Sequence, residues 1–163
     1  MIVRSRAPLR LGLAGGGTDV SPFSEQHGGF VMNVTIDKFA YATLDPSPSG
    51  QAEFHALDAQ SVQALDPEAV DGSPGPQQLM RGVYLRVSEQ LLGGRRPALR
   101  VRAHSDAPPG SGLGSSSTMV VALVTAFAEY FGLALGEYEI AQLAYDIERK
   151  DLSLSGGKQD QYA

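Results

Sequence analysis

A glycine- and serine-rich segment and two carboxylates that follow it have the residue types needed to transfer a phosphoryl group. The segment Pro108 to Ser117 reads Pro-Pro-Gly-Ser-Gly-Leu-Gly-Ser-Ser-Ser, and the carboxylates belong to Glu148 and Asp160. Glycines let backbone N–H groups approach an anion, and a helix that begins after them adds unpaired N–H donors and a positive dipole end. Phosphoryl transfer also needs a metal ligand and a group that orients the attacking hydroxyl, and carboxylates can supply both.

Two well-known phosphate-binding motifs do not fit this segment. A P-loop carries a lysine directly after its last glycine, and no lysine follows here. The dinucleotide-binding pattern Gly-x-Gly-x-x-Gly differs from the spacing of Gly110, Gly112 and Gly114. Taken alone, the segment is equally consistent with an anion site and with a serine-capped helix that follows a glycine turn.

A second glycine cluster lies near the N-terminus, at Gly15 to Gly17, and Thr18 and Asp19 follow it. Glycines leave room for a ligand, and Asp19 can accept hydrogen bonds from sugar hydroxyl groups. Arg10 can steady a phosphate or a carboxylate. The alternatives are a tight turn for the glycines and, for Asp19, an N-cap to a short helix that opens at Ser21-Pro22.

Hydrophobic periodicity predicts the elements that position these residues. Strands are expected at 2–13, at 52–57 and at 98–103, and a hairpin is expected from 30–36 and 39–44, turned at Asp37-Lys38. Helices are expected at 79–92, 119–131 and 135–150, with another beginning near 159, and 66–77 is a surface connection. Since strands precede helices, the pattern predicts an α+β fold rather than a regular βαβ array.

Composition excludes several classes of protein. The 163 residues suit one domain, and the absence of cysteine excludes disulfide frameworks and thiolate metal sites and fits a cytoplasmic protein. A net charge of −5 with scattered basic residues argues against a nucleic-acid partner. No apolar run reaches the roughly 20 residues of a membrane span, and no signal peptide begins the chain, so we expect no membrane partner.

The run Pro-x-x-x-Gly-Leu-Gly-Ser-Ser at 108–116 resembles the second signature of the GHMP kinases, the galacto-, homoserine, mevalonate and phosphomevalonate kinases. This resemblance implies ATP and Mg²⁺ as cofactors, with Ser116 and Glu148 as metal ligands. It implies an ATP phosphate site made of Pro109, Gly110, Ser111, Gly112, Leu113, Gly114, Ser115 and Ser116. The run from Gly156 to Gln161 resembles the Asp-Gln element of the family, which implies that Asp160 is the catalytic base, with Arg10 assisting it.

The run from Arg6 to Val20 resembles the first signature of the family, which closes around the acceptor, and this implies that Gly16, Gly17, Thr18 and Asp19 bind the substrate. Galactokinases have an acidic residue and a histidine where this chain has two glycines. The form Leu-Gly-Leu-Ala-Gly-Gly-Gly-Thr-Asp is similar to that of the family's heptose 7-phosphate kinases. It implies transfer of a phosphoryl group from ATP to the anomeric hydroxyl of D-glycero-D-manno-heptose 7-phosphate, giving the 1,7-bisphosphate.

The resemblance extends over residues 1–163 and implies the family's N-terminal ATP-binding domain, an α+β fold related to ribosomal protein S5 domain 2. The family's third, glycine-rich signature and its C-terminal domain are not found, so we expect a domain truncated at its C-terminus. Its expected partners are a small sugar phosphate and either the missing C-terminal half or another copy of the chain. Two alternatives stay open: a kinase for a galactose- or fucose-like sugar, and a non-catalytic, dimerising fragment.

Overall fold

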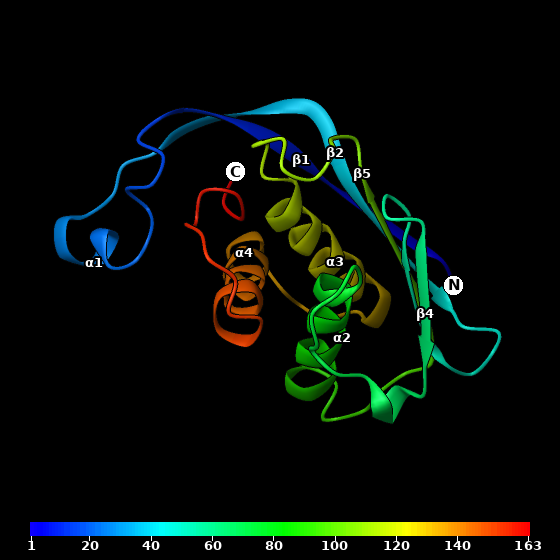
Figure 1. Ribbon diagram of the computed structural model, residues 1–163. Coiled ribbons are helices and arrows are strands. Elements are labelled where there is room, and N and C mark those ends of the chain that lie inside the picture. The colour runs from blue at the N-terminus through cyan, green and yellow to red at the C-terminus, as the bar shows by residue number, and fades with distance from the viewer.

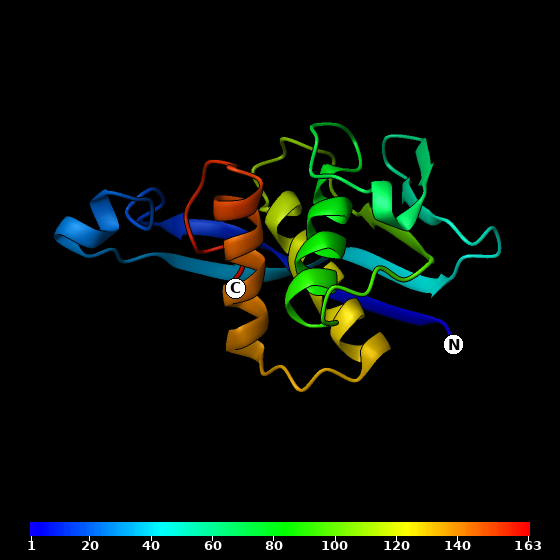
Figure 2. The same ribbon diagram turned by 90° about the horizontal axis from the view of Figure 1, so that it is seen from below.

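The computed structural model describes residues 1–163 as a sheet covered on one face by helices (Figure 1, Figure 2). The strands are β1 (Val3–Ala14), β2 (Met32–Pro46), β3 (Ala52–Ala56), β4 (Ser61–Leu65) and β5 (Leu99–Ser105). The helices are α1 (Phe23–His27), α2 (Gln78–Gln90), α3 (Ser115–Phe131) and α4 (Glu137–Asp146), with a 3-10 turn at Pro67–Ala69 and a π-helical turn at Ile147–Asp151. This mixed arrangement confirms the predicted α+β class.

The sheet has the strand order β1-β2-β5-β3-β4. Neighbouring strands run antiparallel except β3 and β5, which are parallel. In β5 the buried residues Leu99, Val101 and Ala103 alternate with half-buried arginines, as predicted for a strand with one face on the core. None of the helices is both long and apolar enough to cross a membrane.

The core lies between the sheet and the helices α2 and α3. Tyr84 of α2 packs edge-on against Phe54 of β3 and Phe127 of α3, with ring centroids 5.6 and 6.4 Å apart. All three rings are buried, and the Tyr84 hydroxyl donates to the carbonyl of Pro97 at 3.0 Å, so its polar atom is paired. This packing fixes α3, the helix that follows the glycine- and serine-rich segment.

The predicted hairpin at residues 30–44 is wrong, because β2 runs straight through Asp37-Lys38 and pairs with β1 along most of its length. This dipeptide lacks the glycine that a two-residue hairpin turn favours. The register shifts here instead: Pro8 pairs with Phe39 and Arg10 with Thr35, so the extra residues of β2 form a bulge. The strand β4, which pairs with β3, was not predicted.

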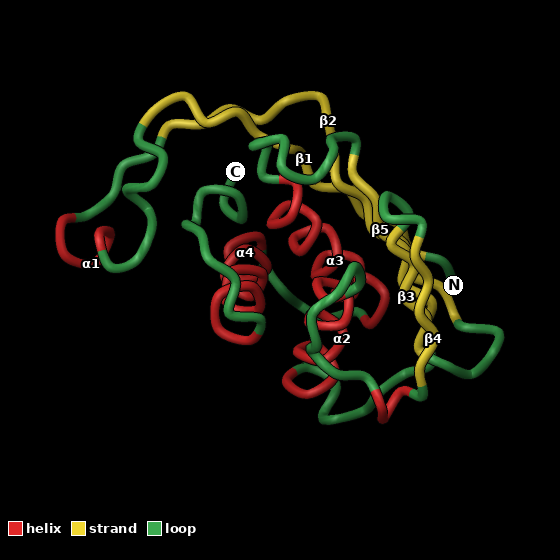
Figure 3. The backbone as a smooth tube through the Cα atoms, viewed as in Figure 1, coloured by secondary structure: helices red, strands yellow, loops and turns green.

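Beyond the rest of the sheet, β1 and β2 continue as a two-stranded ribbon that curves over the helices and carries α1 at its tip (Figure 3). The C-terminal segment passes beneath this ribbon (Figure 1). The helix predicted near residue 159 is a turn, closed by a 3.2 Å bond from the Gln161 N–H to the Lys158 carbonyl. Two segments from opposite ends of the chain therefore lie side by side.

Replacing Phe127 by alanine is expected to lower the free energy of unfolding by about 3–5 kcal/mol, because it leaves a cavity between the sheet and α2. Urea denaturation followed by circular dichroism measures this change. Phe30 is 86% exposed, so Phe30→Ala serves as the matched control and should change stability by less than about 0.5 kcal/mol. Equal effects of the two substitutions would contradict the assigned core.

Candidate active site

The segment between β5 and α3 turns at three glycines in the left-handed region. Gly110, Gly112 and Gly114 have φ angles of +79°, +76° and +77°, which side chains rarely permit. Gly114 is also the N-cap of α3, and no side chain caps the first turn of this helix. The serine-capped alternative is therefore wrong, and the N–H groups at the start of α3 remain free to bind an anion. We call residues 108–117 the cradle.

Arg10 joins the cradle to Asp160. Its Nε donates to Asp160 Oδ1 at 2.6 Å and its Nη2 forms an ion pair with the same oxygen. Its Nη1 donates to the carbonyl of Gly112 at 2.7 Å, and its backbone N–H donates to the Leu113 carbonyl at 3.2 Å. Arg10 is only 8% exposed, so these bonds pair a charge that has largely left water.

The Asp160 carboxylate lies directly against the cradle. A Cβ atom added to Gly114 would lie 3.0 Å from the Asp160 carboxyl carbon, a tight contact, and the positive φ of Gly114 also favours glycine. The carboxylate receives its hydrogen bonds from Arg10 on Oδ1, and no donor contacts Oδ2. A carboxylate with one free oxygen thus lies beside an anion site.

Glu148 is buried at the start of the π-helical turn that follows α4, with 1% of its surface exposed. Ser117 Oγ donates to its Oε1 at 3.1 Å, and Gln161 Nε2 donates to its Oε2 at 2.5 Å. Burial raises the pKa of the Glu148 carboxyl above its ordinary value, and these donors together with Arg149 offset the effect only in part. The structure therefore brings Ser117 to Glu148, whereas Ser116 is exposed at the start of α3.

Asp19 connects the ribbon to the segment that carries Asp160. Its Oδ2 accepts the backbone N–H groups of Lys158 at 2.7 Å and Gln159 at 2.9 Å, while its buried Oδ1 has no partner. A side chain on Gly157 would clash with this carboxylate, so glycine is needed there too. Burial alone would raise the pKa of Asp19, but the N–H donors of Gln159 and Lys158 outweigh it and leave the pKa below its usual value.

The other predicted acceptor-site residues lie where the ribbon turns. The Thr18 hydroxyl donates to the Gly15 carbonyl at 2.8 Å and accepts the Phe30 N–H at 3.0 Å, so it closes the turn. Gly16 faces the C-terminal segment, because an added Cβ would lie 4.0 Å from Gln159 Nε2. Gly17 has a φ of +92° and open space around it. The glycines therefore form the tight turn that was one alternative, and this turn still leaves space for a ligand.

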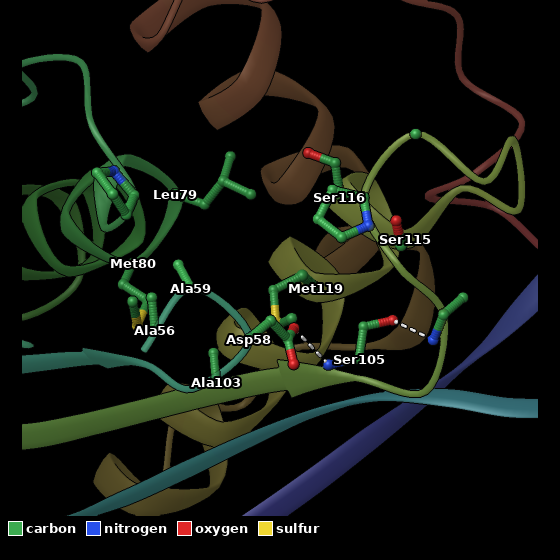
Figure 4. Close-up of a pocket in the computed structure, with 14 residues that line it drawn as sticks. Ala56, Asp58, Ala59, Leu79, Met80, Ala103, Ser105, Ser115, Ser116 and Met119 are labelled. Carbon is green, nitrogen blue, oxygen red and sulfur yellow. Dashed lines mark hydrogen bonds between the residues drawn. The ribbon is translucent and has the colours of Figure 1, made fainter. Parts of the chain in front are cut away.

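A cavity of about 350 Å³ opens next to the cradle between the sheet, α2 and the start of α3 (Figure 4). Leu79, Met80 and Met119 give it apolar walls, and Asp58 and Ser105 are held on its floor by a 2.9 Å bond from the Ser105 N–H to the Asp58 carboxylate. The cradle residues Pro109, Gly110, Ser115 and Ser116 form its other side. It can take a flat, mostly apolar group attached to an anion.

Sequence reasoning selected Arg10, the cradle, Glu148 and Asp160, and the structure brings them into one site. Sequence reasoning missed the cavity, because its lining residues come from separate elements and share no motif. It also missed the pairing of Ser117 with Glu148, for which the position of the third serine on the helix was the one available signal. No group of three or more His, Cys, Asp or Glu side chains that could hold a metal ion occurs.

Comparisons with known proteins agree with this geometry. Residues 78–163 match the family model of the GHMP kinases N terminal domain. The chain is 43% identical to a D-glycero-alpha-D-manno-heptose 7-phosphate kinase of Campylobacter jejuni over 99% of its length, and 30% identical to an L-fucokinase/L-fucose-1-P guanylyltransferase of Bacteroides fragilis. The crystal structure of a D-glycero-D-manno-heptose 1-phosphate kinase from Bacteroides thetaiotaomicron is similar over the whole chain, with a TM-score of 0.88 and 48% identity.

The chain spans about half the length of these heptose kinases. It covers 47% of the Campylobacter protein and 53% of the Bacteroides thetaiotaomicron chain. It covers 19% of the Bacteroides fragilis protein. The similarity therefore concerns the part of each relative that aligns with residues 1–163.

Replacing Asp19 by alanine is expected to lower the free energy of unfolding by about 1–3 kcal/mol, because two backbone N–H groups lose a charged acceptor. Since the pKa of Asp19 is lowered in the folded state, its stabilising effect is complete above the ordinary value of 3.8 and is lost as pH falls through the lower folded value. Urea denaturation at pH 7 and at several acidic pH values measures the difference. Asp37→Ala, at an exposed position, is the control; a difference that grows in acid would contradict the assigned bonds.

Proposed function

Because the chain belongs to the GHMP kinase family, we propose that it is the ATP-binding, base-bearing part of a kinase that phosphorylates the anomeric hydroxyl of D-glycero-D-manno-heptose 7-phosphate. The observation that carries the proposal is the contact between the Asp160 carboxylate and the cradle at Gly114. A base next to a phosphate site is the arrangement that phosphoryl transfer to a hydroxyl requires. An ATP donor implies the cytoplasm as the working compartment.

The nucleotide binds with its base in the cavity and its phosphates on the cradle. The apolar walls formed by Leu79, Met80 and Met119 suit the faces of adenine. Ser115 and Ser116 line the cavity and also belong to the cradle. A bound nucleotide can therefore extend directly from the cavity to the cradle. The free N–H groups of the first turn of α3 donate hydrogen bonds to phosphate oxygens.

The residues around Glu148 fit a magnesium ion. Mg²⁺ prefers oxygen ligands and is usually held by one or two carboxylates together with substrate phosphates, so a larger acidic cluster is not needed. Glu148 and Ser117 supply oxygens, and Gln161 Oε1 is buried there without a hydrogen-bond partner. Ser116, exposed at the helix start, adds a hydroxyl on the side of the phosphates. When bound, the ion neutralises charge on the transferring phosphoryl group.

Asp160 takes the proton of the acceptor hydroxyl on its free Oδ2. The acceptor O–H bond breaks as its oxygen bonds to the γ-phosphorus, and the bond between that phosphorus and the bridging oxygen of ADP breaks. Arg10 holds Oδ1 and so fixes the direction in which Oδ2 points. Arg10 is buried, and the two residues before Asp160, Lys158 and Gln159, donate backbone hydrogen bonds to Asp19; both features keep the Asp160 carboxylate in one orientation.

The heptose acceptor is supported by the similarity to the Campylobacter and Bacteroides thetaiotaomicron kinases. Gly16, Gly17, Thr18 and Asp19 border the acceptor, and the two glycines leave space for it. A fucose-like acceptor is the second candidate, because the chain is 30% identical to part of a fucokinase. The half-length coverage supports a partner that completes the site, either a C-terminal half or another copy of the chain. It also keeps a non-catalytic fragment as an alternative.

Nucleotide binding is tested by thermal unfolding. At 100 times its dissociation constant, MgATP should stabilise the chain by about 2.7 kcal/mol and raise the Tm accordingly. Ala59→Phe, at an exposed position on the cavity edge, should abolish the shift by filling the space of the base. Ala69→Phe, exposed and outside the cavity, is the matched control and should keep it. No shift in the wild-type chain would refute the kinase proposal for this chain.

Acceptor choice is tested with a panel of sugars and sugar phosphates, following ATP consumption and product formation by ³¹P NMR. We expect turnover with D-glycero-D-manno-heptose 7-phosphate, measured with the chain alone and with the C-terminal half of a relative added. Asp160→Asn should lower kcat at least about 100-fold while leaving the MgATP thermal shift in place. Preference for unphosphorylated fucose or galactose would replace the heptose assignment.

A further inference from the structure

Gln161 is buried against Glu148, and neither the proposed base nor the nucleotide site uses its side chain. It is 4% exposed, and its Nε2 donates to Glu148 Oε2 at 2.5 Å. Ser117 donates to the other carboxylate oxygen at 3.1 Å. Each oxygen of Glu148 therefore has its own neutral donor, and the plane of the carboxylate is fixed from two sides.

A buried carboxylate depends strongly on such donors. Removal from water disfavours its charged form, and a positive partner close by normally compensates. The nearest cation is Arg149, whose Nη1 lies 3.9 Å from Glu148 Oε1 and also donates to the carbonyls of Leu154 and Ser155. Gln161 and Ser117 are therefore the two groups that donate hydrogen bonds to the Glu148 oxygens and fix the position of this carboxylate.

The carbonyl oxygen of the Gln161 amide is an acceptor that remains available to a ligand. Its Oε1 is buried and has no hydrogen-bond partner, although buried acceptors are nearly always paired. The paired Nε2 of the same amide is bonded to the carboxylate proposed to bind the metal. A cation, or a water molecule on it, would satisfy this oxygen.

We propose that Gln161 is a positioning residue for the metal carboxylate Glu148 and that its Oε1 adds a further oxygen to the divalent-cation site. This inference rests on the proposed function, since it assigns a role within the same site. Gln161 directly follows Asp160, so the proposed base and the residue that positions the metal carboxylate are neighbours in one turn. A shift of this turn would change both together.

The first experiment measures Mn²⁺ affinity by electron paramagnetic resonance in the presence of ADP. Gln161→Leu preserves the approximate shape of the side chain but removes both amide functions. It should weaken Mn²⁺ binding about 10- to 100-fold, the range seen when residues that orient metal ligands are replaced. The control is Gln142→Leu, which removes a glutamine bonded to Asp146 and Tyr162, and it should leave the affinity unchanged. A folded Gln161→Leu chain with wild-type Mn²⁺ affinity overturns the proposal.

The second experiment uses the metal alone, so it does not depend on nucleotide binding or turnover. Gln161→Glu places a second carboxylate beside Glu148, and the Tm without metal should fall because like charges are buried together. MgCl₂ should then raise the Tm of this variant more than that of the wild-type chain, compared with NaCl at equal ionic strength. An equal response of both chains overturns the proposal, even if Gln161→Leu fails to fold. Absence of metal-dependent ADP binding in the wild-type chain, with the Gln161→Glu response present, would instead refute the proposed function.

Discussion

The ion pair between Arg10 and Asp160 joins the first strand of the sheet to the last turn of the chain, across 150 residues of sequence. Both side chains are largely withdrawn from water, and charges in such a place are tolerated only when they are paired and hydrogen-bonded. Arg10 meets this requirement with Asp160 on one side and the Gly112 carbonyl on the other. The cradle and the carboxylate are therefore placed relative to the same guanidinium group.

The segment that carries Asp160 has no helix or strand of its own, and its order comes from side chains that reach it from elsewhere. Asp19 holds the N–H groups of Lys158 and Gln159, Arg10 holds the next residue, and Glu148 holds Gln161. Four successive residues are thus bonded to three distant parts of the molecule. Such a segment can be rigid without regular secondary structure. Each hydrogen bond restricts the conformational freedom of the backbone, as helical hydrogen bonds do in a helix.

The amino-acid sequence predicted the parts of the fold that depend on local pattern. The helices α2 and α3 and the strand β5 follow from apolar periodicity, and glycines with positive φ mark the cradle. The hairpin prediction failed because the bulge opposite Pro8 is decided by pairing with another strand, which local sequence does not encode. The strand β4 was missed because only one of its alternating faces packs, and no buried run marks it.

The same distinction holds for the candidate site. The resemblance to the family's motifs selected Glu148 and Asp160, and Arg10 lies within the run that resembles the first of those motifs. It did not identify the hydrogen bonds that the C-terminal segment donates to Asp19, since bonds from backbone N–H groups leave no pattern of residue types. The cavity beside the cradle was missed for a related reason: its lining is brought together by packing alone.

The ribbon of β1 and β2 has a consequence for how the protein is made. Asp19 leaves the ribosome long before Lys158 and Gln159, to which it is bonded across 139 residues. Loop closure entropy grows slowly with length, by about 0.6 kcal/mol per doubling, so the separation costs little stability, but folding slows when distant segments must meet. The sheet and α3 can form during synthesis, before the C-terminal segment that contacts the ribbon has been made. The contact between the ribbon and the C-terminal segment is thus formed late in folding.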